Sequence, residues 1–586
     1  MLSAADAGDA AALLAAVPAD RRVALVDPRF VGHLHALRLG LTDPRFPAAT
    51  VPGALTAQPQ ARRALLRALD RTTAAVGAGA PVVDPDTDPA PEDRTVAGRI
   101  AVALESEGVA VQRPALGSLV AAVPTDPEQQ AAAETARASV DDEAVRLRSA
   151  VKAHDGFFTT FCISPYSRYI ARWCARRGFT PNQVTTASLI TALIAAGSAA
   201  TGTRGGYIAA GILLLVSFVL DCTDGQLARY SLQYSTMGAW LDATFDRAKE
   251  YAYYAGLAIG AARGGGSDDV WALALGAMVL QACRHVVDFS FNEANHDAVA
   301  NTSPTAALSD KLDSVGWTVW ARRMIVLPIG ERWAMIAVLT AFTTPRIVFY
   351  ALLVGCAIAA CYTTAGRLLR SLTRKAGRTD RAAQALADLA DSGPLAQAVA
   401  AVAPGLRGAF TAPALALLGT LVMVGAALFL PYGSPLTIAA AAVYVLLSGL
   451  AVARPLKGAL DWLAPPFFRA AEYVTILVLA ARSDVPHAVP AAFGLVSAVA
   501  YHHYDTVYRI RGGTGAPPQW LVRTIGGHEG RTALVAVLAA VLTQGSGFTT
   551  ALTVLAVVVA LVVLVESIRF WVSSSAPAVH DEGELA

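Results

Sequence analysis

The stretch that decides the fold is LDCTDGQLARYSLQYSTMGAWLDATFD, residues 220–246. It places four aspartates, Asp221, Asp224, Asp242 and Asp246, where two long apolar segments meet. The i, i+3 spacing of the first pair and the i, i+4 spacing of the second put each pair on one face of a helix. The pattern therefore predicts a helical hairpin that carries a cluster of carboxylates at a membrane boundary.

The composition places this hairpin in a membrane protein. The chain has 586 residues, of which 54% are hydrophobic and only 16% are charged. Such a composition predicts a mainly α, polytopic helical membrane protein. The net charge of +2 offers no electrostatic footprint for nucleic acid, so no nucleic-acid partner is expected.

Apolar segments long enough to be membrane helices fall into two groups. The first lies at about 183–201, 205–227, 237–262, 269–290, 332–344 and 346–366, and the second at about 409–430, 435–453, 467–481, 487–508, 531–545 and 548–571. Arg and Lys gather on alternate connections, which marks those connections as cytosolic. We therefore expect two groups of six helices, with both termini and the aspartate cluster on the cytosolic side.

Composition also divides the chain into parts. Residues 1–150 contain no apolar span and predict a small soluble α/β domain, a scaffold or regulatory unit, with a strand at 22–27. The predicted first membrane domain is 151–370, and its start, 157–177, reads as an amphipathic helix on an anionic leaflet. The remaining expectations are a cytosolic linker at 371–405, a second membrane domain of unknown role at 406–575 and an acidic tail at 576–586.

The four aspartates predict a metal site. Unpaired carboxylates at a bilayer boundary repel one another and lose hydration unless a cation compensates them. A set of oxygen ligands without His or Cys favours Mg²⁺ or Mn²⁺, and magnesium commonly binds together with substrate phosphates. Gly225, Ala228 and Gly238 leave room for a flat ligand beside the acids. The plain alternative is a set of solvated acids at helix ends.

These residues carry a resemblance. The pattern Asp221-x2-Asp224-Gly225-x2-Ala228-Arg229-x8-Gly238-x3-Asp242-x3-Asp246 resembles the signature of the CDP-alcohol phosphotransferase family, and every defining position is filled. The resemblance covers roughly 155–370. It implies a bundle of six membrane helices after an amphipathic helix, in an enzyme of phospholipid biosynthesis. Such an enzyme moves a phosphoalcohol from a CDP-linked donor, for example CDP-diacylglycerol, to an acceptor alcohol and releases CMP.

The resemblance also implies roles for individual residues. Two metal ions would be held by Asp221, Asp224 and Asp242 with help from Asp246, and Asp246 would also be the base that deprotonates the acceptor. The residues expected to border the nucleotide are Gly225, Ala228, Arg229 and Gly238. Family members commonly form homodimers among membrane lipids, so a homodimer in a bacterial plasma membrane is expected.

The acceptor alcohol stays open at this stage. Possible acceptor-binding residues are Arg284, His285, Arg322, Arg323 and Arg332, because cations on the cytosolic side suit a phosphorylated alcohol. The alternative is that these arginines set the membrane topology or contact lipid headgroups. Nothing in the sequence separates inositol phosphate, glycerol phosphate, serine or another hydroxyl.

Two other functions compete with this interpretation. An intramembrane prenyltransferase also uses Asp-rich helices with Mg²⁺ on a diphosphate, and a cation-coupled transporter or flippase could use the acids to bind its coupling ion.

The second membrane domain carries no copy of the signature. Its polar residues near the predicted cytosolic helix ends include Arg469, Glu472, His502 and His503. Two adjacent His residues point about 100° apart on a helix, so interhelical ion pairing is favoured over a metal site.

Overall fold

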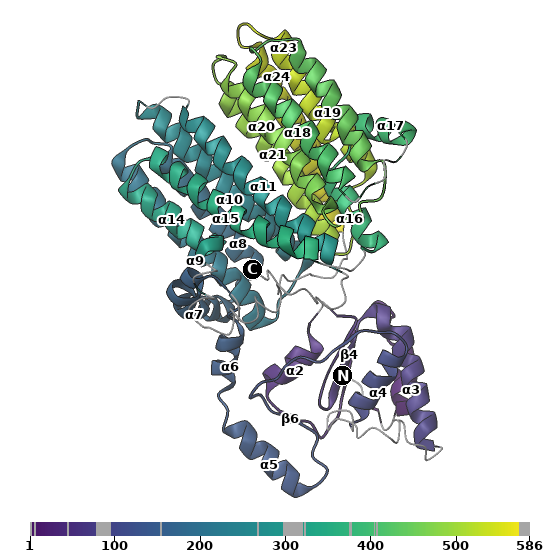
Figure 1. The fold of residues 1–586 in the computed structure, drawn as a ribbon. Helices are drawn as coiled ribbons and strands as arrows, with labels where there is room; N and C mark the ends of the chain where they lie inside the picture. Colours follow the sequence, from purple (N-terminus) through teal and green to yellow (C-terminus); the bar gives the residue numbers. More distant parts are fainter. Residues whose placement is uncertain are drawn as a thin grey trace.

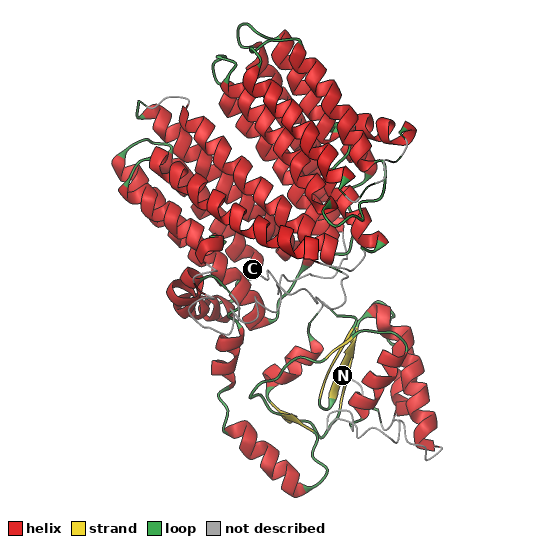
Figure 2. Cartoon of the chain, viewed as in Figure 1, coloured by secondary structure: helices red, strands yellow, loops and turns green. Residues whose placement is uncertain are grey.

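The computed structural model describes residues 3–4, 7–43, 46–77, 95–152, 155–265, 269–296, 320, 324–373, 378–403, 405, 408 and 410–573. Two helical bundles lie side by side, and a smaller α/β domain lies beneath the first of them (Figures 1 and 2). The predicted acidic tail lies outside the described residues.

The N-terminal domain is built on a small mixed sheet. Its elements are α1 (Ala7–Ala16), β1 (Val23–Val26), β2 (Val31–Gly32), α2 (Leu34–Leu41), β3 (Ala48–Val51), β4 (Ala54–Ala57), η1 (Pro59–Ala61), α3 (Arg62–Gly77), α4 (Val96–Ser106), β5 (Val111–Gln112) and β6 (Ala121–Ala122). The main sheet has the order β1-β4-β3-β5, with β5 parallel to β3, and β2 pairs with β6. Leu55, Leu65, Ile100 and Leu104 form part of its core. The α/β prediction and the strand at 22–27 are therefore confirmed.

Two further helices lead from this domain to the first bundle. They are α5 (Pro127–Ala138) and α6 (Asp142–Ser149). Leu147 of α6 and the following Ala150 pack against Tyr230, near the C-terminal end of α9 (Arg204–Ser231) in the first bundle. Because α6 touches the helix that carries the first aspartate pair, the N-terminal domain lies on the same side of the bundle as the candidate site.

The first bundle contains the predicted helices. A π-helical turn, η3 (Thr159–Ile163), is followed by α7 (Ser164–Arg176), α8 (Pro181–Ala199), α9 (Arg204–Ser231), α10 (Thr236–Arg263), α11 (Asp269–Asn295), α14 (Ile329–Phe342) and α15 (Pro345–Thr373). The α7 helix keeps Tyr166, Tyr169 and Trp173 exposed and buries Ala171 and Cys174. This is the two-faced helix predicted for the membrane surface.

Local signals set the helix ends around the hairpin. Thr180 forms a capping box with Gln183 at the start of α8, and Ser235 caps α10 by accepting a hydrogen bond from the Gly238 amide at 2.9 Å. Leu232 adopts a left-handed conformation that ends α9. The turn between α9 and α10 is consequently tight, and the two aspartate pairs face each other across it.

The second bundle begins within the predicted linker. Its elements are α16 (Asp380–Ala390), α17 (Pro394–Val402), α18 (Thr411–Phe429), α19 (Leu436–Val452), η4 (Asp461–Leu463), α20 (Ala464–Ala481), α21 (Ala488–Arg511), α22 (Gln519–Thr524), α23 (Gly527–Val541) and α24 (Gly547–Ser573). The α16 helix buries Leu386 and Leu389 against bundle helices, and α17 packs on α19. Most of 380–402, which lies within the predicted linker at 371–405, is thus packed helix, because its apolar residues recur at helical spacing.

Six helices among the described residues are long and apolar enough to cross a membrane. They are 204–231, 270–295, 345–373, 411–429, 461–481 and 547–573. The other six predicted spans are also helices at the expected positions, but each is either shorter or less apolar. The chain is a polytopic helical membrane protein with two six-helix bundles.

Candidate active site

Three carboxylates meet between α9 and α10, well inside both helices. One oxygen from each of Asp221, Asp242 and Asp246 lies within 4.8 Å of the other two. Asp224 is buried one turn further along α9 and accepts a hydrogen bond from the Thr185 hydroxyl of α8 at 2.6 Å. The structure therefore brings three of the predicted residues into one cluster and holds the fourth beside it.

A lysine compensates part of the negative charge of this cluster. The Lys249 ammonium is fully buried, lies 2.9 Å from an Asp246 carboxylate oxygen and also contacts Asp221. It also donates a hydrogen bond to the Ser188 hydroxyl at 3.2 Å and lies 5.5 Å from the centroid of the Trp333 ring. The sequence analysis missed Lys249, although it follows Asp246 by three residues and so lies on the same helical face.

Lys249 lies between two carboxylates whose negative charge requires a positive partner. A buried ammonium between two carboxylates stands where a positive charge is needed to compensate them. The described donor set consists of carboxylate oxygens without His or Cys, which suits Mg²⁺ or Mn²⁺. The residues present thus fit the metal that the family resemblance implies.

A side chain on either of two glycines of the signature would meet a neighbouring polar side chain. A Cβ on Gly238 would lie 2.7 Å from the Ser235 hydroxyl and 2.8 Å from the Asn182 side-chain oxygen, so a side chain there would displace both. A Cβ on Gly225 would be 3.5 Å from the Arg229 guanidinium. Arg229 itself is anchored, because its Nε donates to the Ala150 carbonyl at 2.6 Å.

The candidate acceptor residues have protein partners. Arg332 is buried and lies 3.1 Å from Glu250. Arg284 donates to the Val326 carbonyl, and His285 contacts the Tyr504 hydroxyl of the second bundle. Arg322 and Arg323 lie outside the described residues. Arg284, His285 and Arg332 thus each contact another group of the protein, and an acceptor role for them remains a prediction.

Comparison with known proteins decides the family of the first bundle. Residues 179–360, which include the whole aspartate signature, match the family model of the CDP-alcohol phosphatidyltransferases. This chain contains a CDP-alcohol phosphatidyltransferase domain. The match confirms the resemblance drawn from the signature and places the domain in a family of transferases of phospholipid headgroups. Residues 380–586 match a second family, described as a family of unknown function (DUF5941).

Three curated relatives align with parts of the chain. A "Bifunctional IPC transferase and DIPP synthase" of Aquifex aeolicus is 33% identical over 118 residues, which are 19% of this chain and 26% of that protein. An "Archaetidylinositol phosphate synthase" of Pyrococcus horikoshii is 36% identical over 91 residues, 16% of this chain and 47% of that protein. A "Phosphatidylinositol phosphate synthase" of Streptomyces avermitilis is 31% identical over 118 residues, 20% of this chain and 46% of that protein. The chain therefore spans between about a quarter and a half of these relatives.

Proposed function

We propose that this protein transfers a phosphatidyl group from CDP-diacylglycerol to a hydroxyl of an inositol phosphate and releases CMP. The observation that carries the proposal is the cluster of Asp221, Asp242 and Asp246 within a CDP-alcohol phosphatidyltransferase domain. Two of the relatives are named as synthases of inositol phosphate lipids, which favours this acceptor over the other alcohols.

The carboxylates hold the metal in this proposal. Asp221, Asp224 and Asp242 bind two divalent ions with help from Asp246. When bound, such ions neutralise the donor diphosphate and stabilise the charge that develops on phosphorus and on the CMP leaving group. Lys249 keeps Asp221 and Asp246 compensated before the ions arrive.

The other residues of the signature bind and orient the substrates. Asp246 accepts the proton of the attacking acceptor hydroxyl, which requires it to lie within hydrogen-bond reach of that group. Gly225, Ala228 and Gly238 admit the flat cytidine beside the helices. Arg229, fixed on Ala150, faces the diphosphate, since a positioned guanidinium is a strong partner for phosphate oxygens.

The proposed setting is the plasma membrane of a bacterium. The site opens to the cytosol, both termini are cytosolic, and the N-terminal domain lies on the site side. Its contact with α9 through α6 supports this arrangement.

The test is CMP release by the purified full-length protein in detergent. The protein is given CDP-diacylglycerol with inositol phosphate, glycerol phosphate, inositol or serine, in Mg²⁺ or in EDTA. We expect release with inositol phosphate and Mg²⁺ only. Asp246→Asn should lower the rate at least about 100-fold, because it removes the proton acceptor.

The matched control is Asp126→Asn, which removes the charge of an aspartate in the N-terminal domain. Asp126 caps α5, and Asn caps helices equally well, so its rate should equal that of the native protein. Release that survives EDTA or Asp246→Asn contradicts the mechanism. If CMP is released with another alcohol, that alcohol is the acceptor in place of inositol phosphate. Ion-coupled lipid flux without any CMP release supports a transporter.

A further inference from the structure

The helices of the two bundles pack in the same order. In the first bundle α8 packs on α9 and α10, α9 on α14, and α11 on α15. In the second bundle α18 packs on α19 and α20, α19 on α23, and α21 on α24. Numbered from one to six, both bundles therefore pair helix 1 with 2 and 3, helix 2 with 5, and helix 4 with 6. A short helix precedes each bundle and packs on its second helix, α7 on α9 and α17 on α19.

A buried ionic framework joins helices 3 and 5 of the first bundle. Glu250 on α10 lies 2.9 Å from Arg247 on the same helix. The same carboxylate lies 3.1 Å from the Nε atom of Arg332 on α14. All three residues are buried, so the pairing is not a contact at the surface.

The second bundle repeats this framework at equivalent places. Glu472 on α20 lies 2.9 Å from Arg469 on the same helix and 2.5 Å from the Nε atom of Arg531 on α23. The local sequences also agree, since RAKEY at 247–251 corresponds to RAAEY at 469–473. An isolated five-residue similarity is weak, but here it coincides with the same two helices and the same pairing geometry.

The short preceding helix is held in the same way in both bundles. Glu331 on α14 accepts a hydrogen bond from the Phe158 amide at 3.3 Å, at the start of the segment that leads into α7. Glu529 on α23 accepts bonds from the Gly393 and Ala396 amides, each at 3.0 Å, at the start of α17. In each bundle a glutamate of helix 5 thus satisfies free amides at the beginning of the short helix.

The positions of the second bundle that align with the carboxylate cluster carry other residues. Aligned on the shared framework, Asp242, Asp246 and Lys249 correspond to Ala464, Phe468 and Ala471. Helix α19 contains no Asp or Glu, and Glu472, the one acid of α20, is used by the two arginines. Aromatic packing replaces the site.

That aromatic packing is dense. The His528 ring stacks on Phe468 with centroids 4.2 Å apart, and the Tyr444 hydroxyl lies 2.7 Å from His528 Nδ1. Asp391, in the turn after α16, adds a carboxylate between Arg469, Arg531 and His502. Burial alone would raise the pKa of Asp391, but His502 and the two arginines hold it well below its usual range. The interhelical ion pairing predicted for this half is therefore confirmed.

The two bundles meet through the same helices. Helix α11 packs on α20, α10 packs on α21, and α11 and α21 also pack on each other. Helix 3 of each bundle thus contacts helix 4 of the other, which is the reciprocal arrangement of a two-fold interface. Figure 1 shows the two bundles in contact along α11, α20 and α21.

The second bundle touches the helix that carries the second aspartate pair. Trp571 of α24 stacks on Trp240 of α10, with ring centroids 6.1 Å apart. The Tyr504 ring of α21 lies 5.2 Å beneath the Arg247 guanidinium, next in sequence to Asp246. These contacts fix both ends of the short segment that holds Asp242 and Asp246.

We propose that the C-terminal bundle is a degenerate second copy of the CDP-alcohol phosphatidyltransferase fold, without a metal site, that serves as a built-in partner subunit for the first. It occupies the face formed by α10 and α11 and positions the catalytic helix through Tyr504 and Trp571. One chain then contains one active site and does not need a second chain on this face. The inference goes beyond the proposed function and holds for any acceptor.

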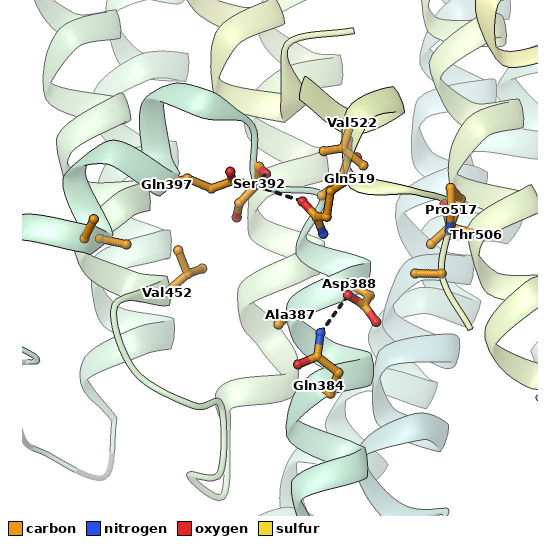
Figure 3. A pocket seen from close by; sticks show the side chains of 14 residues that line it. Gln384, Ala387, Asp388, Ser392, Gln397, Val452, Thr506, Pro517, Gln519 and Val522 are labelled. Atoms are coloured by element: carbon orange, nitrogen blue, oxygen red, sulfur yellow. Dashed lines mark hydrogen bonds between the residues drawn. The ribbon is translucent and has the colours of Figure 1, made fainter. Parts of the chain in front are cut away.

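A cavity of about 400 Å³ in the second bundle does not take the place of the lost site. It is lined by Asp388, Ser392, Gln397, Thr506 and Gln519 and lies among α16, α17, α21 and α22 (Figure 3). Its lining includes no residue of α20, the helix that corresponds to the catalytic α10. The cavity is therefore separate from the place where the first copy holds its aspartates.

The test counts chains, contacts and metal ions in the full-length protein in detergent. The variant Trp240→Cys/Trp571→Cys is treated with a short bis-maleimide, with each single variant as a control for the native cysteines. We expect a cross-link within one chain and, by native mass spectrometry, one chain per particle. A cross-link between chains, or a homodimer joined through α10 and α11, overturns the built-in partner.

The metal count tests the loss of the second site. Mn²⁺ titration of the native protein, followed by electron paramagnetic resonance, should show ions that are all lost in Asp221→Asn/Asp246→Asn. If this variant still binds Mn²⁺ and the further substitution Glu472→Gln removes that binding, the second bundle has a metal site of its own. That result would overturn the proposal of a copy without a metal site. If the native protein binds no Mn²⁺, the proposed function is contradicted instead. The cross-link would still show whether the second bundle of the same chain covers α10.

The positioning role has its own readout, which rests on the proposed function. Tyr504→Leu removes the ring beneath Arg247 and should lower kcat about tenfold while KM for the donor stays within about twofold, because misplaced catalytic groups cost rate more than binding. Tyr504→Phe keeps the ring and should restore most of kcat. A change confined to KM, or an equal loss in the Phe variant, contradicts positioning by the ring.

Discussion

At the residue scale, Lys249 determines how the carboxylate cluster behaves without metal. Its ammonium is buried between Asp221 and Asp246, two of the residues proposed to bind the ions. Bound metal and the ammonium therefore compete for the same oxygens, so Lys249 stabilises the metal-free protein and weakens metal binding.

Replacing Lys249 by Gln should separate these two effects. We expect Lys249→Gln to lower the midpoint of thermal unfolding in EDTA, because the buried acids lose their counter-charge. Saturating Mg²⁺ should raise the midpoint more than in the native protein, because stabilisation by a ligand grows with the logarithm of its concentration divided by Kd, and Mg²⁺ should bind this variant more tightly. Differential scanning fluorimetry in detergent measures both midpoints.

Lys457→Gln is the control for a lysine in an ion pair with an exposed aspartate, Asp380. Surface ion pairs contribute about 0–1 kcal/mol, so its midpoints should match the native ones. If Mg²⁺ stabilises Lys249→Gln no more than the native protein, Lys249 does not compete with the metal.

At the element scale, small residues determine how closely α8 and α10 approach. A Cβ on Gly256 would lie 2.4 Å from the Ala196 carbonyl oxygen, and one on Gly260 would lie 2.1 Å from that of Ala199. The obstacle is backbone in both cases, so the helices must separate to accept a side chain. Because α10 carries Asp242 and Asp246, this packing also sets the position of the site.

The variant Gly256→Ala should therefore destabilise the first bundle. Overpacking costs typically about 1–3 kcal/mol, which should appear as a lower midpoint of thermal unfolding and a reduced rate of CMP release. Gly276→Ala is the matched control in α11, since its Cβ would lie 3.8 Å from the Leu353 side chain. Equal midpoints for the two variants would show that α8 and α10 do not pack this closely.

The elements themselves were largely predictable. All twelve predicted spans are helices, because long apolar runs bounded by polar residues are a local property of the sequence. The helices α16 and α17 within the predicted linker at 371–405 were not predicted, since both are short and amphipathic and gain stability only by packing on the bundle.

At the scale of the whole molecule, the N-terminal domain should respond to acid separately from the membrane bundles. His35 is buried on α2, and burial lowers its pKa from 6.5 to about 4, with Arg146 adding to the shift. The folded pKa lies below the unfolded one, so below pH 6.5 the unfolded state takes up the proton preferentially. Stability that is present above pH 6.5 is consequently lost as the pH falls towards 4.

Hydrogen exchange of the full-length protein checks this pH dependence. Peptides covering β3 and β4, on which α2 packs, should lose protection between pH 6.5 and 4 after correction for intrinsic exchange rates. In His35→Leu this part of the loss should disappear, because the titrating group is gone. The same pH dependence in both proteins would assign it to another group.

The sequence by itself determined the membrane class, the helix positions and the identity of the four aspartates. These features are read from apolar runs and from fixed spacings along two helices, which depend on neighbours in the chain. Only the tertiary structure brought Lys249 between Asp221 and Asp246, committed Arg332 to Glu250 and aligned the two bundles. Such contacts join distant segments, and similarities as short as RAKEY and RAAEY gain meaning only when packing places them at equivalent positions.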